Sequence, residues 1–308
     1  CSGMFTANTM ASAIEAMGLS IPGAASVPAV DPRNKDFALR SGPVLQNLLD
    51  LDLKARDIIT RESLENAITV VPGAAGKITK KDIDEVIEAY TQDALWCEEI
   101  GFDGVEIHGA HEYLIDNFFW EILNQREDDY GGSIKKRTKF ATDIIESIIG
   151  TVDKNFIVGL RFSQWKQQNY EAKLASSPNE LEQFLKPIQS SGIDFLHTSM
   201  RRYWEPEFEG SEENLASWTK SFSKLPTISV GSVGLDKDFQ ETTRWEEEAK
   251  ASKPTSINKA LSDVENGKYD LVAVGRALLA DPEWVLKMKE GRMKDLVPYT
   301  KECMQELR

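Results

Sequence analysis

Three side chains that can donate or exchange protons lie within six residues of one another. They are His108, His111 and Tyr113, in the stretch FDGVEIHGAHEY. Residues 102–107 alternate short apolar and acidic residues, which predicts a buried strand, and Glu106 and His108 then point to the same side of it. Two of the chain's three histidines therefore follow a strand end, where parallel α/β proteins place their active sites.

The same spacing allows two other interpretations. His108 and His111 could bind a metal ion together with Glu106, but no further histidine or cysteine lies close in sequence, and we predict no metal. The histidines could also be a satisfied polar pair beside a packing tyrosine. The ordered trio directly after a strand favours a catalytic site over both.

The elements that must position this trio alternate regularly from residue 79 onward. Further strands are expected at residues 156–163, 194–199, 226–234 and 269–276. Helices are expected at residues 79–100, 138–151, 178–190, 256–266 and 277–290. This alternation predicts an α/β fold with a parallel sheet and right-handed crossovers. Five strand–helix units are too few for a closed eight-stranded (β/α) TIM-type barrel, so the barrel is expected to be partial.

The chain before this pattern is of a different kind. Helical periodicity is expected at residues 6–17, 37–53 and 61–71, with no strand before residue 100. The Pro- and Gly-rich segment 72–76 is expected to be a linker. We therefore predict a helical segment at residues 1–71 and a barrel-type domain at residues 72–308.

Charge and composition narrow the possible partners. The formal net charge is −14, which disfavours nucleic acid and anionic membrane surfaces. No apolar run approaches the roughly 20 residues that span a bilayer, and the first residues lack the features of a secretory signal. Three widely spaced cysteines (Cys1, Cys97 and Cys303) indicate a reducing compartment, so a cytoplasmic location is expected.

The region around the trio resembles the old yellow enzyme family of FMN-dependent ene-reductases. The matching residues are His108-x-x-His111-x-Tyr113-Leu114 and Asn124-x-Arg126-x-Asp128-x-Tyr130-Gly131-Gly132-Ser133, with Arg137 and Phe140 in step behind them. The resemblance extends over residues 72–308 and implies an FMN cofactor, NAD(P)H as co-substrate and a small enone-type substrate. It places the five strands as strands four to eight, so the first three strands are missing.

The resemblance assigns catalytic roles to the trio. His108 and His111 would donate hydrogen bonds to the carbonyl oxygen of an α,β-unsaturated substrate, which stabilises the enolate formed as hydride arrives. Tyr113 would protonate the α-carbon as a general acid.

The resemblance also implies the cofactor-binding residues. Arg161, at a strand's carboxyl end, would lie near N1 and O2 of the flavin ring, although a surface salt bridge is its alternative. Gly231 and Gly234 follow one strand, and Gly275 and Arg276 follow the next. In barrels these two loops often bind phosphate through backbone N–H groups.

Two further groups lie outside the catalytic and cofactor-binding assignments. Residues 200–204, MRRYW, and Trp165 could shape the substrate or nicotinamide pocket, or could be solvated loop. Tyr130, Gly131 and Gly132 are expected to form a structural turn, in which Arg126 and Asp128 pair.

Residues 1–71 resemble a different family, the dihydroxy-acid dehydratases. The matching stretches are CSGMFTANTM from Cys1, EAMGLS from Glu15, DIIT from Asp57 and ENAITVV from Glu65. The resemblance implies that Cys1 corresponds to one ligand of an iron–sulfur cluster, but the other ligands lie outside this segment, and a free thiol is the simpler interpretation.

Three functional hypotheses follow. The first is an FMN-dependent NAD(P)H oxidoreductase, impaired by the missing strands. In that case the half barrel could close by dimerising or by borrowing helices from residues 1–71. The second is a non-catalytic fusion or remnant that acts only as a folded or oligomeric protein. The third, iron–sulfur dehydratase activity, lacks most of its site. Flavin colour distinguishes the first hypothesis from the second.

Overall fold

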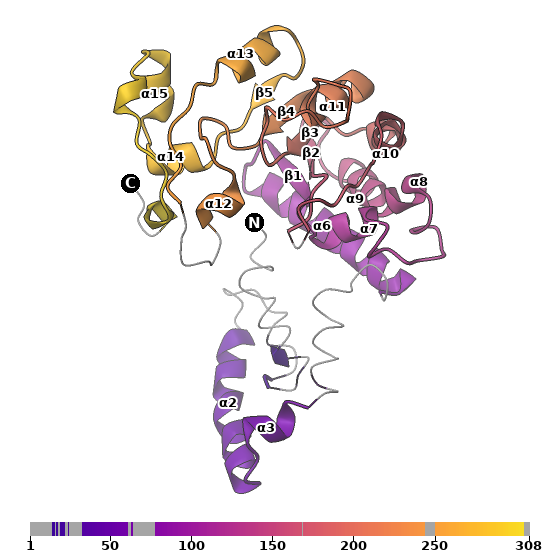
Figure 1. The fold of residues 1–308 in the computed structure, drawn as a ribbon. Coiled ribbons are helices and arrows are strands. Elements are labelled where there is room, and N and C mark those ends of the chain that lie inside the picture. The colour runs from indigo at the N-terminus through magenta and orange to yellow at the C-terminus, as the bar shows by residue number, and fades with distance from the viewer. Residues whose placement is uncertain are drawn as a thin grey trace. The chain divides into compact units, whose positions relative to one another are not determined.

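The computed structural model describes residues 33–60, 78–167, 169–243 and 250–304, together with residues 14, 15, 17, 19–21, 24 and 63. The chain divides into two compact units, Cys1–Thr79 and Lys80–Arg308 (Figure 1). The boundary expected between residues 71 and 72 lies outside the described residues, as do nearly all of the helices expected at residues 6–17 and 61–71.

The first unit contains two described helices, α2 (Arg33–Asp50) and α3 (Ala55–Ile58). A helix was expected at residues 37–53. Helix α2 begins four residues earlier than this helix and also ends three residues earlier. Leu51 and Asp52 form the turn that follows, with Asp52 at a φ of +51°. Within α2, Leu45 and Leu49 of the expected apolar stripe are 59% and 65% exposed.

The second unit is built on a parallel sheet of five strands in sequence order. The strands are β1 (Gly104–Gly109), β2 (Ile157–Phe162), β3 (Phe195–Ser199), β4 (Thr227–Val230) and β5 (Leu271–Val272). The register aligns His108 with Arg161 and Arg161 with His197 across the first three strands. The carboxyl ends of the strands therefore lie along one edge of the sheet, as the sequence predicts.

Helices cover the outer face of this sheet (Figure 1). Three helices contact the strands: α6 (Lys80–Glu99), which precedes β1, and the crossover helices α9 (Lys139–Ile149) and α11 (Leu215–Ser223). Helix α10 (Pro178–Ser190) packs on α9 and α11. The remaining helices are α7 (Leu114–Phe119), α8 (Ile134–Arg137), α12 (Phe239–Thr243), α13 (Asn258–Glu265), α14 (Arg276–Ala280) and α15 (Trp284–Lys289), with the 3₁₀ turns η3 (Met293–Asp295) and η4 (Lys301–Met304).

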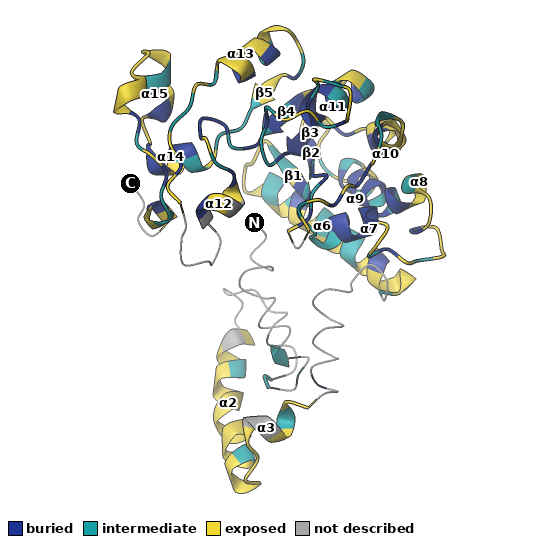
Figure 2. Ribbon diagram, viewed as in Figure 1, coloured by how far each residue is buried: buried dark blue, intermediate teal, exposed yellow. Residues whose placement is uncertain are grey.

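The two faces of the sheet differ in chemistry. Outward-facing side chains such as Ile107, Leu160 and Leu196 are buried under the helices, where the dark residues of Figure 2 gather. Alternation along each strand places the other set, including His108, Arg161 and His197, on the inner face. A closed barrel fills its interior with branched apolar residues, so this polar inner face is unlike a packed barrel core.

The structure confirms the partial barrel and corrects three details. Within the described residues, β1 and β5 each pair with one neighbour only, so the sheet is not closed. The last strand is two residues long rather than the expected eight. The helix expected at residues 277–290 is instead two helices, because Pro282 interrupts it. Helix α11 was not expected from the sequence.

Candidate active site

The loop after β1 holds His111 in a turn of unusual backbone geometry. His111 and Glu112 have φ angles of +62° and +66°, the left-handed region that non-glycine residues rarely adopt. Two side-chain oxygens bind this turn. Ser163 Oγ accepts from the His111 N–H at 3.0 Å, and Asp116 Oδ2 accepts from the Glu112 N–H at 2.7 Å. The turn is thus fixed by contacts with the end of β2 and with α7.

The three residues predicted to be catalytic lie together. The ring of His108 is 5.3 Å from that of His111 and 4.9 Å from that of Tyr113, centroid to centroid. Strand β1 supplies His108, the left-handed turn supplies His111, and Tyr113 directly precedes α7. The structure therefore brings the trio together, while the role of each member remains a prediction.

A hydroxyl group joins His111 to Arg161. Ser199, the last residue of β3, has its Oγ 2.7 Å from His111 Nε2 and accepts from Arg161 Nη2 at 3.2 Å. The His111 ring also stacks on Trp165, at 4.4 Å and 23°. Ser199 was not predicted from the sequence, although its place at a strand's carboxyl end matches that of Arg161 and could have identified it.

Burial sets the charge state of both histidines. Burial, and next the charge of Arg161, lowers the pKa of His108 to about 4 and the pKa of His111 to about 2. Both rings are therefore neutral at pH 7. A neutral imidazole carries one N–H donor, which suits it to a hydrogen bond with a neutral carbonyl oxygen.

Glu106 is bonded across the sheet instead of to the trio. Its Oε2 accepts from His197 Nδ1 of β3 at 2.7 Å. Burial raises the pKa of Glu106, but the hydrogen bond from His197 and nearby positive charge outweigh it, and the net shift is downward. Within the described residues, no three histidine, cysteine, aspartate or glutamate side chains are placed to hold a metal ion.

A cavity of about 310 Å³ opens at the carboxyl ends of the strands. Its wall contains five of the eight predicted site residues, which come from strand β2 and from the segments that follow β1, β4 and β5: His111, Arg161, Gly231, Gly275 and Arg276. Trp165, Met200 and Arg201 also line it, in keeping with their predicted place at the pocket mouth. The other predicted residues, His108, Tyr113 and Gly234, are not among its lining residues.

Arg161 presents a hydrogen-bond donor that no group in the described part of the chain uses. Its Nε is buried and has no partner among the described residues, although its Nη2 donates to Ser199. Burial lowers the pKa of Arg161. Buried donors are nearly always satisfied in proteins, so a donor without a partner on a residue that lines a cavity indicates a ligand acceptor. The N1 and O2 atoms of a flavin ring are acceptors of the required kind.

The three predicted glycines differ in what they leave room for. A Cβ on Gly231 would lie 2.7 Å from the carbonyl oxygen of Met200, and one on Gly234, at a φ of +74°, would lie 2.7 Å from the Trp284 ring. A Cβ on Gly275 would meet nothing within 4 Å. Packing within the protein therefore accounts for Gly231 and Gly234, whereas Gly275 borders open space.

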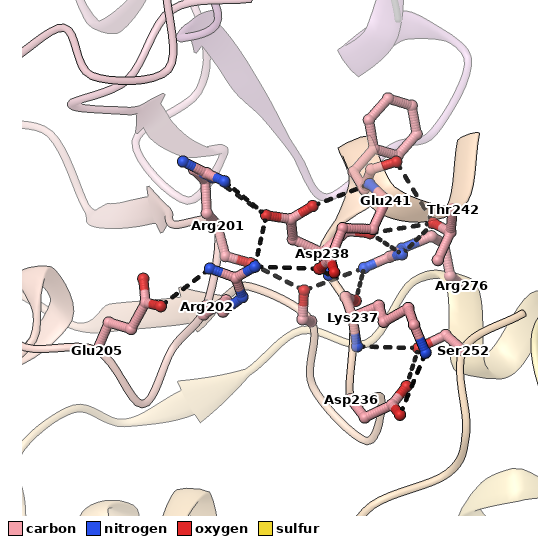
Figure 3. A network of polar contacts seen from close by, with 12 residues as sticks. Arg201, Arg202, Glu205, Asp236, Lys237, Asp238, Glu241, Thr242, Ser252 and Arg276 are labelled. Carbon is pink, nitrogen blue, oxygen red and sulfur yellow. Dashed lines mark hydrogen bonds and ion pairs between the residues drawn. The ribbon is translucent and has the colours of Figure 1, made fainter. Parts of the chain in front are cut away.

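Arg276 binds the protein itself (Figure 3). Its guanidinium donates to the backbone oxygens of Asp238 (2.9 Å) and Lys237 (3.0 Å) and to the hydroxyls of Thr242 (2.6 Å) and Ser232 (3.1 Å). The predicted phosphate-binding arginine thus fastens the loop at residues 232–242. The positive charge of Arg276 remains at the cavity wall, but its Nη1 and Nη2 groups already donate hydrogen bonds to the protein.

A buried carboxylate, which sequence analysis missed, organises the same loop. Asp238 is 1% exposed, and its Oδ2 lies 2.8 Å from Arg201 and 3.1 Å from Arg202 (Figure 3). Burial opposes ionisation of Asp238, but the Arg201 hydrogen bonds hold its pKa below the ordinary value. The cavity wall therefore carries three arginines against one aspartate, a balance that suits an anionic ligand such as a phosphate.

The parallel sheet is open, and titratable and cationic groups lie at its carboxyl edge. This arrangement is typical of α/β enzymes built on a (β/α) barrel, here a partial one. Residues 55–251 match the family described as the NADH:flavin oxidoreductase / NADH oxidase family. The chain belongs to this family, as its motif predicts. Residues 1–80 match a second description, the N-terminal part of dihydroxy-acid/6-phosphogluconate dehydratases, which confirms the other predicted resemblance.

Individual relatives agree with the family. An NADH oxidase of Thermoanaerobacter brockii is 32% identical over 71% of this chain and 31% of its own length. A cinnamate reductase of Clostridium sporogenes is 27% identical over 77% of this chain and 36% of its own length. This chain spans between 20% and 58% of the length of such curated relatives.

A solved structure supports the fold. The old yellow enzyme homologue from Zymomonas mobilis superposes with a TM-score of 0.55 at 21% identity, covering 72% of this chain and 55% of that one. The shared architecture is therefore a part of a barrel. Among the helices of the described residues, none has the length and apolar character needed to cross a membrane.

Proposed function

We propose that this chain is an FMN-dependent NAD(P)H oxidoreductase of the ene-reductase type, acting on small α,β-unsaturated carbonyl compounds. The observation that carries the proposal is the cavity at the strand ends, lined in part by Arg161, whose buried Nε has no partner among the described residues. Membership of the NADH:flavin oxidoreductase family supports it.

The residues present fit an FMN. Arg161 would hold the pyrimidine edge of the ring, and the loops at Gly231–Gly234 and Gly275–Arg276 would hold the phosphate through backbone N–H groups, with the arginines supplying positive charge. Open space at Gly275 allows such an approach. When bound, FMN supplies the redox chemistry, accepting hydride from the nicotinamide and delivering it to the alkene.

The trio would supply the polar half of the reaction. His108 and His111, neutral at pH 7, donate hydrogen bonds to the substrate carbonyl and stabilise the enolate oxygen. Tyr113 gives its phenolic proton to the α-carbon, so that hydride at the β-carbon and proton at the α-carbon complete the reduction. One relative is named a cinnamate reductase, and cinnamate has the conjugated alkene that this chemistry requires.

The test is the absorbance spectrum of the purified protein after incubation with FMN and desalting. We expect retained flavin absorbance in the wild-type protein, and loss of it in Arg161→Met, which removes the donor. NADH or NADPH oxidation that depends on added enone would then establish the reaction. Absence of retained flavin in the wild-type protein would refute the proposal.

The second candidate is a folded protein without catalysis, and a specific observation favours it. The described sheet has five strands and is open at β1 and β5, so contacts that a closed barrel makes to its ligand are missing. This candidate predicts no flavin retention and no enone-dependent oxidation. We also propose that the protein is cytoplasmic and forms a homo-oligomer. Sedimentation analysis tests the formation of the homo-oligomer.

A further inference from the structure

A fully buried ion pair lies beside the left-handed turn. Lys166 Nζ is 2.6 Å from Asp116 Oδ1, and both side chains are 0% exposed. Burial raises the pKa of Asp116, while the Lys166 contact opposes that rise. Lysine and aspartate are almost never fully buried unless they are paired, and removing one partner leaves an uncompensated buried charge. Neither residue belongs to the motif that carries the family resemblance, and the proposed chemistry uses neither.

The pair acts on the backbone of the turn. Asp116 lies in the first turn of α7, and its second oxygen, Oδ2, accepts the Glu112 N–H at 2.7 Å. Lys166 lies in the loop after β2, where mutual backbone hydrogen bonds with Asn169 hold it. The carboxylate therefore has one oxygen on the lysine and the other on a residue whose φ is +66°.

We propose that the Asp116–Lys166 pair is a positioning couple for His111. The hydrogen bond to Glu112 keeps two consecutive non-glycine residues in the left-handed region, and the contact with Lys166 orients the Asp116 carboxyl group. His111 is thereby held in its stack on Trp165 and at Ser199. The importance of this geometry for turnover rests on the proposed function, but the positioning itself does not.

If the Asp116–Lys166 pair only stabilised the fold, its replacements would not affect His111 as the positioning role predicts. Replacing a buried ion pair by apolar residues of similar volume is often neutral or even stabilising. An apolar pair should therefore preserve the fold while releasing the Glu112 N–H. A neutral polar pair should preserve both, because an asparagine oxygen can still accept from Glu112. The two replacements remove the same charges, including that of Lys166, which lowers the His111 pKa, and only the neutral polar pair keeps an oxygen that can accept from Glu112.

The experiment compares the double variant Asp116→Leu/Lys166→Met with the matched control Asp116→Asn/Lys166→Gln. The readout is the imidazole nitrogen NMR signal of His111 as a function of pH. The chain has only three histidines, so His111→Gln identifies the signal. Thermal unfolding of each variant reports the fold. Asp116→Ala/Lys166→Met provides a second apolar pair that adds no volume.

We expect the control to keep His111 neutral at low pH, as in the wild-type protein. In the apolar pair we expect the His111 pKa to rise by roughly two units, because the ring leaves its buried site. An unchanged His111 signal in a folded apolar variant would overturn the proposal, and so would equal shifts in the apolar variant and the control. Failure of both apolar variants to fold would also overturn it, since the pair would then support the fold.

These measurements need neither flavin nor turnover. If the wild-type protein reduces enones, the rate should fall by about 100-fold in the apolar pair and little in the control, as expected for a misplaced catalytic group. A shifted His111 signal in a protein that reduces no enone would refute the proposed function and leave the positioning inference intact.

Discussion

At the scale of single residues, hydrogen bonds in the site link residues that are predicted to have different functions. Ser199 Oγ bonds to His111, predicted to bind substrate, and accepts from Arg161, predicted to bind flavin. Tyr113 is not part of these Ser199 hydrogen bonds, and its ring lies beside that of His108. The proton donor can therefore be tested separately from the flavin-binding group.

Tyr113→Phe should abolish proton delivery and spare cofactor binding. The phenyl ring keeps its packing against His108 but has no hydroxyl, so we expect enone reduction to fall by about 10²- to 10⁴-fold, the usual contribution of a general acid. Retained FMN absorbance should equal that of the wild-type protein. Steady-state assays with an enone measure the effect. An unchanged rate would exclude Tyr113 as the proton donor.

The lowered histidine pKa values predict how stability depends on pH. The folded protein holds His108 and His111 neutral down to a pKa of about 4 and about 2, whereas both rings protonate near pH 6.5 when the chain unfolds. The unfolded state then binds more protons, so stability should fall as the pH drops from 6.5 toward 4. Urea unfolding at several pH values measures the slope.

The control for that prediction is His108→Gln. Buried acids with raised pKa values, such as Asp116, act in the opposite direction, so the wild-type slope alone is not decisive. Removing His108 removes its proton uptake and should flatten the dependence between pH 6.5 and pH 5. A slope equal to that of the wild-type protein would mean that His108 is not held neutral by the fold.

At the scale of elements, the loops after β4 and β5 serve different purposes. The first loop contains Gly234, whose positive φ and contact with Trp284 are requirements of packing. The second contains Gly275, which borders open space at the cavity. Substitution by alanine should therefore separate stability from ligand binding.

Gly234→Ala should destabilise the protein by about 1–3 kcal/mol, because the methyl group meets the Trp284 ring and the backbone is left-handed. Gly275→Ala should change stability by less than about 0.5 kcal/mol, because its methyl group meets no protein atom. It should nevertheless weaken FMN binding, because it narrows the cavity. Denaturant unfolding and flavin titration of both variants measure these effects. Normal FMN affinity in Gly275→Ala would place the phosphate elsewhere.

The sequence predicted most elements of the second unit, and the reasons are physical. Buried strands and amphipathic helices leave periodic apolar patterns, so β1, β2, α9 and α10 were located within a few residues. The break at Pro282 was readable in principle, because proline disfavours a continuous helix. Helix α11, LASWTKSFS, carries polar residues at buried positions, so its periodicity did not reveal it.

The sequence predicted where single residues of the site lie, but not the contacts between residues that are distant in sequence. His111, Arg161 and Gly275 were placed correctly at strand ends because parallel strands share one carboxyl edge. The left-handed turn at His111 and the contacts of Asp238 and Arg276 depend on partners distant in sequence. Local patterns contain no information about such partners, so these features required the structure.

At the scale of the whole molecule, two families meet in one chain. The first unit, Cys1–Thr79, corresponds closely to the dehydratase match at residues 1–80, and the second contains the sheet and the cavity. The flavin family match begins at residue 55, before the second unit begins. We propose the domain boundary at residues 71 and 72, and ligand binding offers a way to test the independence of the two parts.

FMN should stabilise the second unit alone. A ligand that binds only the folded state adds about 2.7 kcal/mol at a free concentration one hundred times its dissociation constant. The predicted flavin residues all lie in Lys80–Arg308, so calorimetry with FMN should raise the unfolding temperature of one transition and leave the other unchanged. Arg161→Met should remove the shift without removing the transition. A single transition that moves as a whole would show that the two units unfold together, which would contradict a boundary between independent domains.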